Sequence, residues 1–174
     1  RYPHVSIDLE DLLSEEGVRA VQKGSVELAV IGDNVPSEGL ETLLCNVDEL
    51  VLLVPQQHAL AAYRAVPLTQ ALAYDLIALP RSASLTRKVI AAAEAVGQSA
   101  RIRMQVRSFD SMCRMIAHGL GVAIIPQAAA QLYADALGLV VLNLLDAPME
   151  RRLLLAMRRR NELSSAGAAL VQMI

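Results

Sequence analysis

Two serines and an arginine stand together where an apolar segment gives way to a helical pattern. Arg81, Ser82, Ser84 and Leu85 lie between an expected strand and an expected helix. Free backbone N–H groups at a helix start, with hydroxyl groups beside them, bind anions such as carboxylates. A serine at a helix start is also an ordinary N-cap, and an arginine in a loop is often simply solvated. Ligand contact and plain capping therefore both remain open for this segment.

Two other places combine a strand end with a turn or a helix start. Gly32 and Asp33 follow a buried-strand pattern, at the position where ligands approach open α/β sheets. Turn chemistry explains these two residues equally well. Ser108 can cap a helix after an alternating strand, and with Phe109 at the helix start it gives the same geometry. Phe109 fits a place in the hydrophobic core better than a place in a pocket wall.

Patterns typical of enzymes and metal sites are missing from the sequence. It contains no Gly-x-Ser-x-Gly elbow and no Gly-x-x-x-x-Gly-Lys loop, and His4, His58 and His118 have no metal or catalytic spacing. Cys45 and Cys113 lie 68 positions apart, which fits neither a metal site nor a disulfide framework. We therefore predict no enzyme activity, no metal and no cofactor, and we expect a reducing compartment, the cytoplasm.

Composition and charge narrow the class of protein further. The 174 residues are 54% hydrophobic, which allows one large core or two small ones and excludes disorder. A net charge of -2 provides no basic field for a phosphate backbone, so this chain alone should not bind DNA. The uncharged run 115–134 is long enough to span a bilayer, but it contains His, Gly, Pro and Gln residues. Two elements joined by a turn explain this run better than a membrane span.

Strand and helix patterns alternate along the chain, which is typical of α/β proteins with mainly parallel sheets. The expected strands are 5–10, 26–31, 40–54 (as one long strand or two), 76–79, 102–106, 122–125, 139–144 and 151–157. The expected helices are 14–23, 67–74, 85–96, 108–118, 127–137 and a final helix from Ser164 or Ser165 to Ile174. Strict alternation marks residues 5–10 as an edge strand, and Pro148 breaks the chain.

Four segments, in this order, resemble the effector-binding domain of bacterial LysR-type transcriptional regulators. They are Arg1-Tyr-Pro-His-Val-Ser-Ile-Asp-Leu with the helix after it, Gly24-Ser-Val-Glu-Leu-Ala-Val-Ile-Gly, Gly119-Leu-Gly-Val-Ala-Ile-Ile-Pro, and an arginine-rich strand followed by Leu163-Ser-Ser-Ala-Gly-Ala-Ala-Leu. The resemblance covers the whole chain. It implies a two-lobed, periplasmic-binding-protein-like (type II) fold in which each lobe is a mainly parallel sheet flanked by helices.

The same resemblance implies two crossover segments, near 45–48 and 147–151. Lobe I would then comprise residues 1–46 plus 149–174, and lobe II would comprise residues 47–148. The family's helix-turn-helix domain, and the first strand and helix of its effector domain, have no counterpart in this sequence. DNA contact would be made only through that missing N-terminal domain.

The resemblance further implies a sensing domain that binds a small-molecule effector, here expected to be a carboxylate, between its lobes. The expected effector contacts are Gly32, Asp33, Arg81, Ser82, Ser84, Leu85, Ser108, Phe109, Gly121 and Val122. We also expect a homodimer or homotetramer, with self-association through the strands at 5–10 and 102–106. The alternative is a periplasmic solute-binding protein of a transporter, which shares the two-lobed fold.

Overall fold

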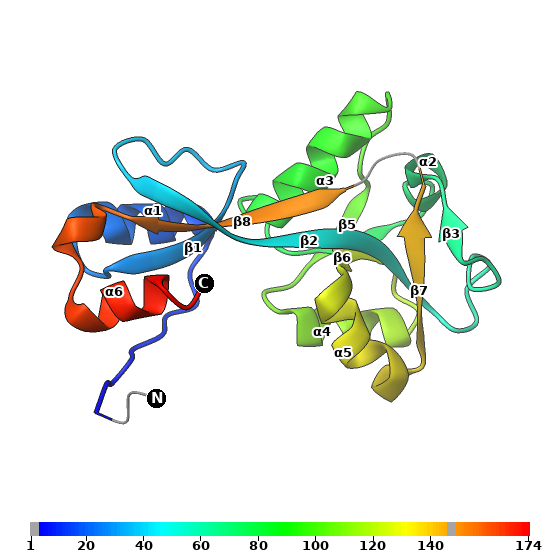
Figure 1. Ribbon diagram of the computed structural model, residues 1–174. Helices are drawn as coiled ribbons and strands as arrows, with labels where there is room; N and C mark the ends of the chain where they lie inside the picture. The colour runs from blue at the N-terminus through cyan, green and yellow to red at the C-terminus, as the bar shows by residue number, and fades with distance from the viewer. Residues whose placement is uncertain (1–3, 146–148) are drawn as a thin grey trace. The chain divides into compact units, whose positions relative to one another are not determined.

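The computed structural model describes residues 4–145 and 149–174 (Figure 1). The helices are α1 (Ser14–Lys23), α2 (Leu68–Ala71), α3 (Ser84–Ala95), α4 (Phe109–Ala117), α5 (Gln127–Leu137) and α6 (Ser165–Val171), with a 3-10 turn at Arg160–Glu162. The strands are β1 (Leu28–Gly32), β2 (Glu41–Pro55), β3 (Ala65–Val66), β4 (Leu76–Ala78), β5 (Ile102–Gln105), β6 (Ala123–Pro126), β7 (Leu139–Leu144) and β8 (Glu150–Met157). The expected break at Pro148 and the first three residues of the Arg1 segment lie outside the described residues.

The chain divides into two compact units, residues 1–46 with 152–174 and residues 47–151. Strands β2 and β8 each contribute residues to both units. The lobe boundaries expected from the sequence stay a prediction, and part of the second expected crossover lies outside the described residues. Within residues 4–145 and 149–174, no helix combines the length and the apolarity needed to cross a bilayer.

The sheet of the first unit has the strand order β1, β8, β2. β1 pairs with β8, from Leu28 opposite Met157 to Gly32 opposite Leu153. Helix α1 packs on one face of this pair, where Val18 is buried against Ile31. Val171 of α6 packs with Leu155 and Met157 in a separate cluster. Because successive residues of a strand point to opposite faces, α1 and α6 cover opposite faces of the pair.

The edge strand predicted at residues 5–10 is wrong. The segment forms no strand, and its apolar side chains are exposed, Ile7 to 70% and Leu9 to 93%. An alternating pattern favours a strand only where a neighbouring strand supplies hydrogen bonds and an apolar face, and such a neighbour is missing here among the described residues. The expected self-association through residues 5–10 therefore lacks the strand that it requires.

The second unit holds both antiparallel and parallel strand pairs. β2 pairs antiparallel with β6 and β7, β3 pairs parallel with β7, and β4 pairs parallel with β5. Leu76 of β4 also bridges Val122, in the parallel sense, just before β6. The expectation of mainly parallel sheets thus holds for the pairs β4–β5 and β3–β7. It needs correction for β1 and β8 in the first unit, and for β2, all of which pair antiparallel. Strand β2 enters the unit from the other one and runs against its neighbours.

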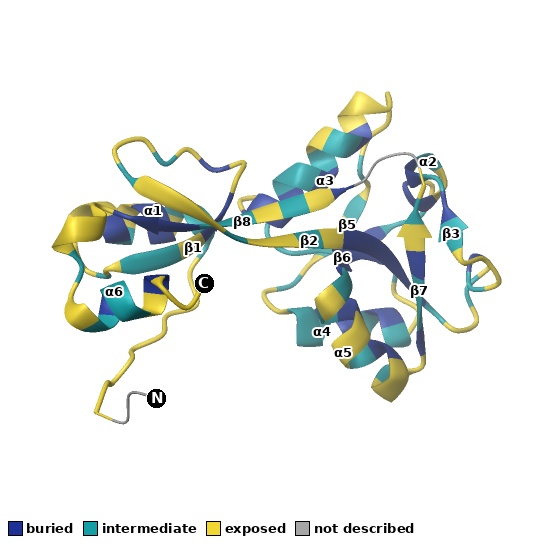
Figure 2. Cartoon of the chain, viewed as in Figure 1, coloured by how far each residue is buried: buried dark blue, intermediate teal, exposed yellow. Residues whose placement is uncertain are grey.

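Strand β2 resolves the alternative of one or two strands at 40–54, because it is continuous from Glu41 to Pro55. Burial is confined to its second half, Leu50–Val54, as Figure 2 shows. Leu52 belongs to the core cluster that contains Leu85 and Val89 of α3. Leu53 belongs to the cluster that contains residues of α4 and α5. The sheet is therefore covered by α3 on one face and by α4 and α5 on the other.

Candidate functional site

The carboxyl ends of β4 and β5 lie side by side, because the two strands pair in parallel with Ala78 opposite Gln105. The chain leaves β4 into α3 on one face of the sheet and leaves β5 into α4 on the opposite face. In open α/β sheets, ligands bind beyond the carboxyl ends of strands where the connections diverge in this way. We call residues 79–85 and 105–109 the β4–β5 edge.

Helix α3 begins at this edge without a side-chain cap. Its N-cap is Ala83, whose side chain accepts no hydrogen bond, and its first turn contains no acidic residue. The capping interpretation of the serines is therefore wrong, since Ser84 is the first helical residue and is only 5% exposed, while Ser82 lies exposed in the preceding turn. The N-cap side chain thus satisfies none of the first-turn N–H groups of α3, and a helix start favours an anion.

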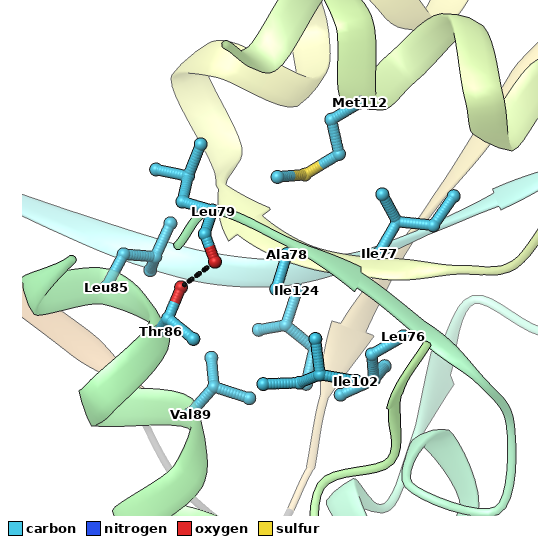
Figure 3. A pocket seen from close by; sticks show the side chains of 10 residues that line it. All are labelled: Leu76, Ile77, Ala78, Leu79, Leu85, Thr86, Val89, Ile102, Met112 and Ile124. Atoms are coloured by element: carbon cyan, nitrogen blue, oxygen red, sulfur yellow. Dashed lines mark hydrogen bonds between the residues drawn. The ribbon is translucent and has the colours of Figure 1, made fainter. Parts of the chain in front are cut away.

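Short hydrogen bonds hold the loop that leads into α3. The Ala83 N–H donates to the Pro80 carbonyl at 2.8 Å, and the Thr86 hydroxyl donates to the Leu79 carbonyl at 3.0 Å (Figure 3). The Arg81 N–H donates to Oε1 of Gln105 at 3.0 Å. Sequence reasoning missed Gln105, because the alternation of residues 102–106 marked it only as part of a solvated strand face.

Helix α4 begins at the same edge with an ordinary cap. Ser108 is its N-cap, and the Ser108 hydroxyl oxygen accepts the Ser111 N–H at 3.2 Å, as the sequence predicted. Asp110 in the first turn pairs with Arg114 at 3.1 Å. Phe109 is half-buried and packs against both core clusters, which agrees with its interpretation as a core residue.

The space beneath the β4–β5 edge is a packing void. A cavity of about 10 Å³ lies between α3, β4 and β5, and nearly all of its lining is apolar (Figure 3). Leu85 and Met112 are among the side chains that line it. This volume holds at most one water molecule. A small-molecule effector therefore does not fit inside this void.

Gly121 and Val122 lie at the other end of β4. The Val122 N–H donates to the Asp75 carbonyl at 3.1 Å, and Val122 pairs with Leu76, the first residue of the strand. The side chain of Val122 is 1% exposed and belongs to the core. Val122 therefore shares a core cluster with Leu85 but pairs with the start of β4, not with its carboxyl end.

Gly32 and Asp33 close β1 in the first unit. The Gly32 N–H donates to the Ser14 hydroxyl at 3.2 Å, and the Asp33 N–H donates to the Arg152 carbonyl at 3.0 Å. The Val35 N–H donates to the Gly32 carbonyl at 3.2 Å and completes a turn. The Asp33 carboxylate lies on an exposed residue, so it is accessible to solvent.

The two cysteines differ in accessibility. Cys113 of α4 is fully buried, and burial together with the nearby Asp110 charge raises the pKa of its thiol to about 11. At pH 8 only about one such thiol in a thousand is ionised, and the thiolate is the reactive form. We therefore expect iodoacetamide to alkylate the half-buried Cys45 in the folded chain and to leave Cys113 unmodified, as read by peptide mass spectrometry. Equal labelling of both cysteines under native conditions would contradict this assignment, and denaturant should expose both.

Solved structures define the class of this chain. The regulatory domain of CcmR from Synechocystis, in complex with 2-PG, superposes with a TM-score of 0.87 at 20% identity, covering 99% of this chain and 83% of that one. The effector-binding domain of QuiR, in complex with shikimate, gives a TM-score of 0.83 at 19% identity, covering 92% and 75%. These likenesses confirm the α/β, type II periplasmic-binding-protein-like fold.

The family follows from the sequence match. The LysR substrate binding domain matches residues 1–174, so the chain belongs to this family of ligand-sensing regulatory domains. The probable RuBisCO transcriptional regulator of a Synechocystis strain is 25% identical over 178 residues, covering 99% of this chain and 52% of that protein. The chain therefore spans about half the length of the curated relatives it matches. Because these relatives are regulators, the match favours a regulator over a solute-binding protein of a transporter.

Proposed function

We propose that residues 1–174 sense a small carboxylate for a LysR-type transcription regulator, and that the carboxylate binds at the β4–β5 edge. The observation that carries this proposal is the start of α3, which has no side-chain cap and follows β4 as α4 follows β5, at the carboxyl ends of two parallel strands. Open α/β folds bind ligands at this position, and a helix start favours negative charge.

The charges around the β4–β5 edge support an anionic effector. Arg81 and Arg107 are both exposed there, and neither forms an ion pair with another described residue. The Asp110 carboxylate is balanced by Arg114, and the first turn of α3 has no acid. An anion at this edge would therefore meet two guanidinium groups and the positive ends of two helices.

One of the solved domains reported above supports the chemical class of the effector. The QuiR domain was solved with shikimate, which is a hydroxylated carboxylate. The proposed contacts in this chain are the side chains or backbone of Arg81, Ser82, Ser84, Leu85, Ser108 and Phe109. The other expected contacts, Gly32, Asp33, Gly121 and Val122, stay predictions. Leu85 and Phe109 would contribute backbone and apolar surface, because both side chains pack in the core.

We also propose how the whole regulator uses this domain. It would act in the cytoplasm as a homodimer or homotetramer, and a separate DNA-binding domain would contact its operator. The domain's own charge supports this division, since a net charge of -2 gives residues 1–174 no electrostatic affinity for DNA. Effector binding would then be linked to DNA binding by a change in conformation.

A thermal-unfolding experiment tests the proposed function. Shikimate, benzoate and acetate are compared with the uncharged methyl esters of shikimate and benzoate. A ligand at 100 times its Kd stabilises the folded state by about 2.7 kcal/mol, which corresponds to a rise in Tm of about 5 °C or more. We expect at least one carboxylate, and neither ester, to raise the Tm.

Arg81→Gln should reduce that shift, whereas Arg19→Gln, an exposed arginine of α1, should leave it unchanged. An unchanged Tm with every acid, or equal shifts with acids and esters, would refute a carboxylate effector.

A further inference from the structure

One side chain joins the two halves of the β4–β5 edge. Gln105 is the last residue of β5, and its Oε1 accepts the Arg81 N–H from the loop after β4, 24 residues earlier in the chain. The Val106 N–H donates to the Ala78 carbonyl at 2.9 Å, so Gln105 lies at the last step where the two strands are hydrogen-bonded. This hydrogen bond therefore ties the loop that contains Arg81 and Ser82 to the end of β5.

The chemistry of the amide fixes which way Gln105 is turned. A backbone N–H is a donor, so it must face the amide oxygen, and the NH2 group occupies the other branch of the same carbon atom. Among the described residues this NH2 group has no hydrogen-bond partner, and Gln105 is exposed. Two N–H donors are thus available at the β4–β5 edge.

We propose that Gln105 determines the specificity of the effector site: its Oε1 positions the loop 79–84, and its Nε2 donates a hydrogen bond to an oxygen of the bound effector. This inference rests on the proposed function, because the effector oxygen is that of an anion bound at the β4–β5 edge. A neutral N–H donor between the Arg81 and Arg107 segments selects ligands that place an acceptor oxygen opposite it. This selection adds to the general attraction between the two arginines and an anion.

Two substitutions separate the two roles. Gln105→Glu keeps an oxygen that accepts the Arg81 N–H, but it loses the donor and adds a negative charge. Gln105→Met keeps the length of the side chain and loses both donor and acceptor. The loop should therefore stay fixed in the Glu variant and loosen in the Met variant, whereas anion binding should weaken in both and more strongly in Glu.

The matched controls are Gln98→Glu and Gln98→Met, which change an exposed glutamine beyond the end of α3. Shikimate is the probe, its Kd is measured by calorimetry, and hydrogen exchange of the Arg81 amide is measured by NMR without ligand. We expect exchange about fivefold faster in Gln105→Met and within twofold of the unchanged chain in Gln105→Glu. The Kd for shikimate should rise about tenfold in Gln105→Met and further in Gln105→Glu, with no change in the Gln98 variants.

Each outcome bears on a separate part of the inference. Unchanged Arg81 exchange in Gln105→Met would overturn the positioning role, and unchanged shikimate affinity in Gln105→Glu would overturn the donor role. In both cases the proposed function would stand, because the chain without substitutions still binds shikimate. If the unchanged chain binds neither shikimate nor any other acid of the panel, the proposed function fails and the specificity role of Gln105 fails with it.

Discussion

Replacing Gly121 with alanine should lower the free energy of unfolding by about 3 kcal/mol or more. Gly121 has a φ of 156°, and a Cβ built on it would lie 2.7 Å from the Asp75 carbonyl oxygen. That oxygen also accepts the Val122 N–H, so it cannot move away without breaking the junction of β4 and the start of β6. Strain in the backbone and a clash with a fixed backbone atom therefore act together.

Gly119→Ala is the matched control for this experiment. Gly119 lies two residues earlier with a φ of 72°, and a Cβ there would have no heavy atom within 4 Å. Gly119→Ala should lower the free energy of unfolding only by the cost of the left-handed conformation, about 1 kcal/mol. Chemical denaturation of both variants measures the difference. Equal losses for the two glycines would show that the close approach to Asp75 is not what requires glycine at position 121.

Leu52→Ala should also destabilise the chain strongly, by about 3 to 4 kcal/mol. Leu52 is fully buried in the second half of β2, opposite Ile124 on one side and Leu142 on the other. Removing its side chain opens a cavity between α3 and the sheet, where packing leaves little room for collapse. Because β2 is central in the second unit, we expect the loss of the Leu52 side chain to destabilise the whole unit.

Leu44→Ala on the same strand provides the comparison. Leu44 is 49% exposed, so its replacement should cost less than about 1 kcal/mol. Urea denaturation monitored by circular dichroism gives both values. If the two substitutions cost the same, the assignment of a buried and an exposed half to β2 is wrong.

Local signals in the sequence were sufficient for much of the fold. Helix α5 and strand β7 have the predicted bounds, 127–137 and 139–144, because Pro126 and Gly138 mark the ends of the helix. Ser108 was correctly identified as a cap, since capping depends only on the next three residues. The strand predicted at 5–10 failed because a strand depends on a partner distant in the sequence, which alternation alone does not reveal.

The candidate site shows the same division between local and distant information. The position of Arg81, Ser82 and Ser84 after a strand and before a helix was predictable from residue types. The cap was misassigned to a serine because the helix begins at Ser84, one residue earlier than a Ser84 cap would require, with Ala83 as the N-cap. Gln105 was not identified, because its role depends on a hydrogen bond to a loop that the sequence separates from it by 24 residues.

The most direct test of a carboxylate site at the β4–β5 edge is NMR mapping of backbone amide shifts during titration of residues 1–174 with shikimate. We expect the largest chemical-shift changes at the amides of Arg81, Ser82, Ser84 and Leu85, with smaller changes at Arg107 and Ser108. The start of α3 should respond most, because it lacks a side-chain cap. Changes confined to residues outside 79–85 and 105–109, with the α3 start unaffected, would contradict the assignment of the effector site.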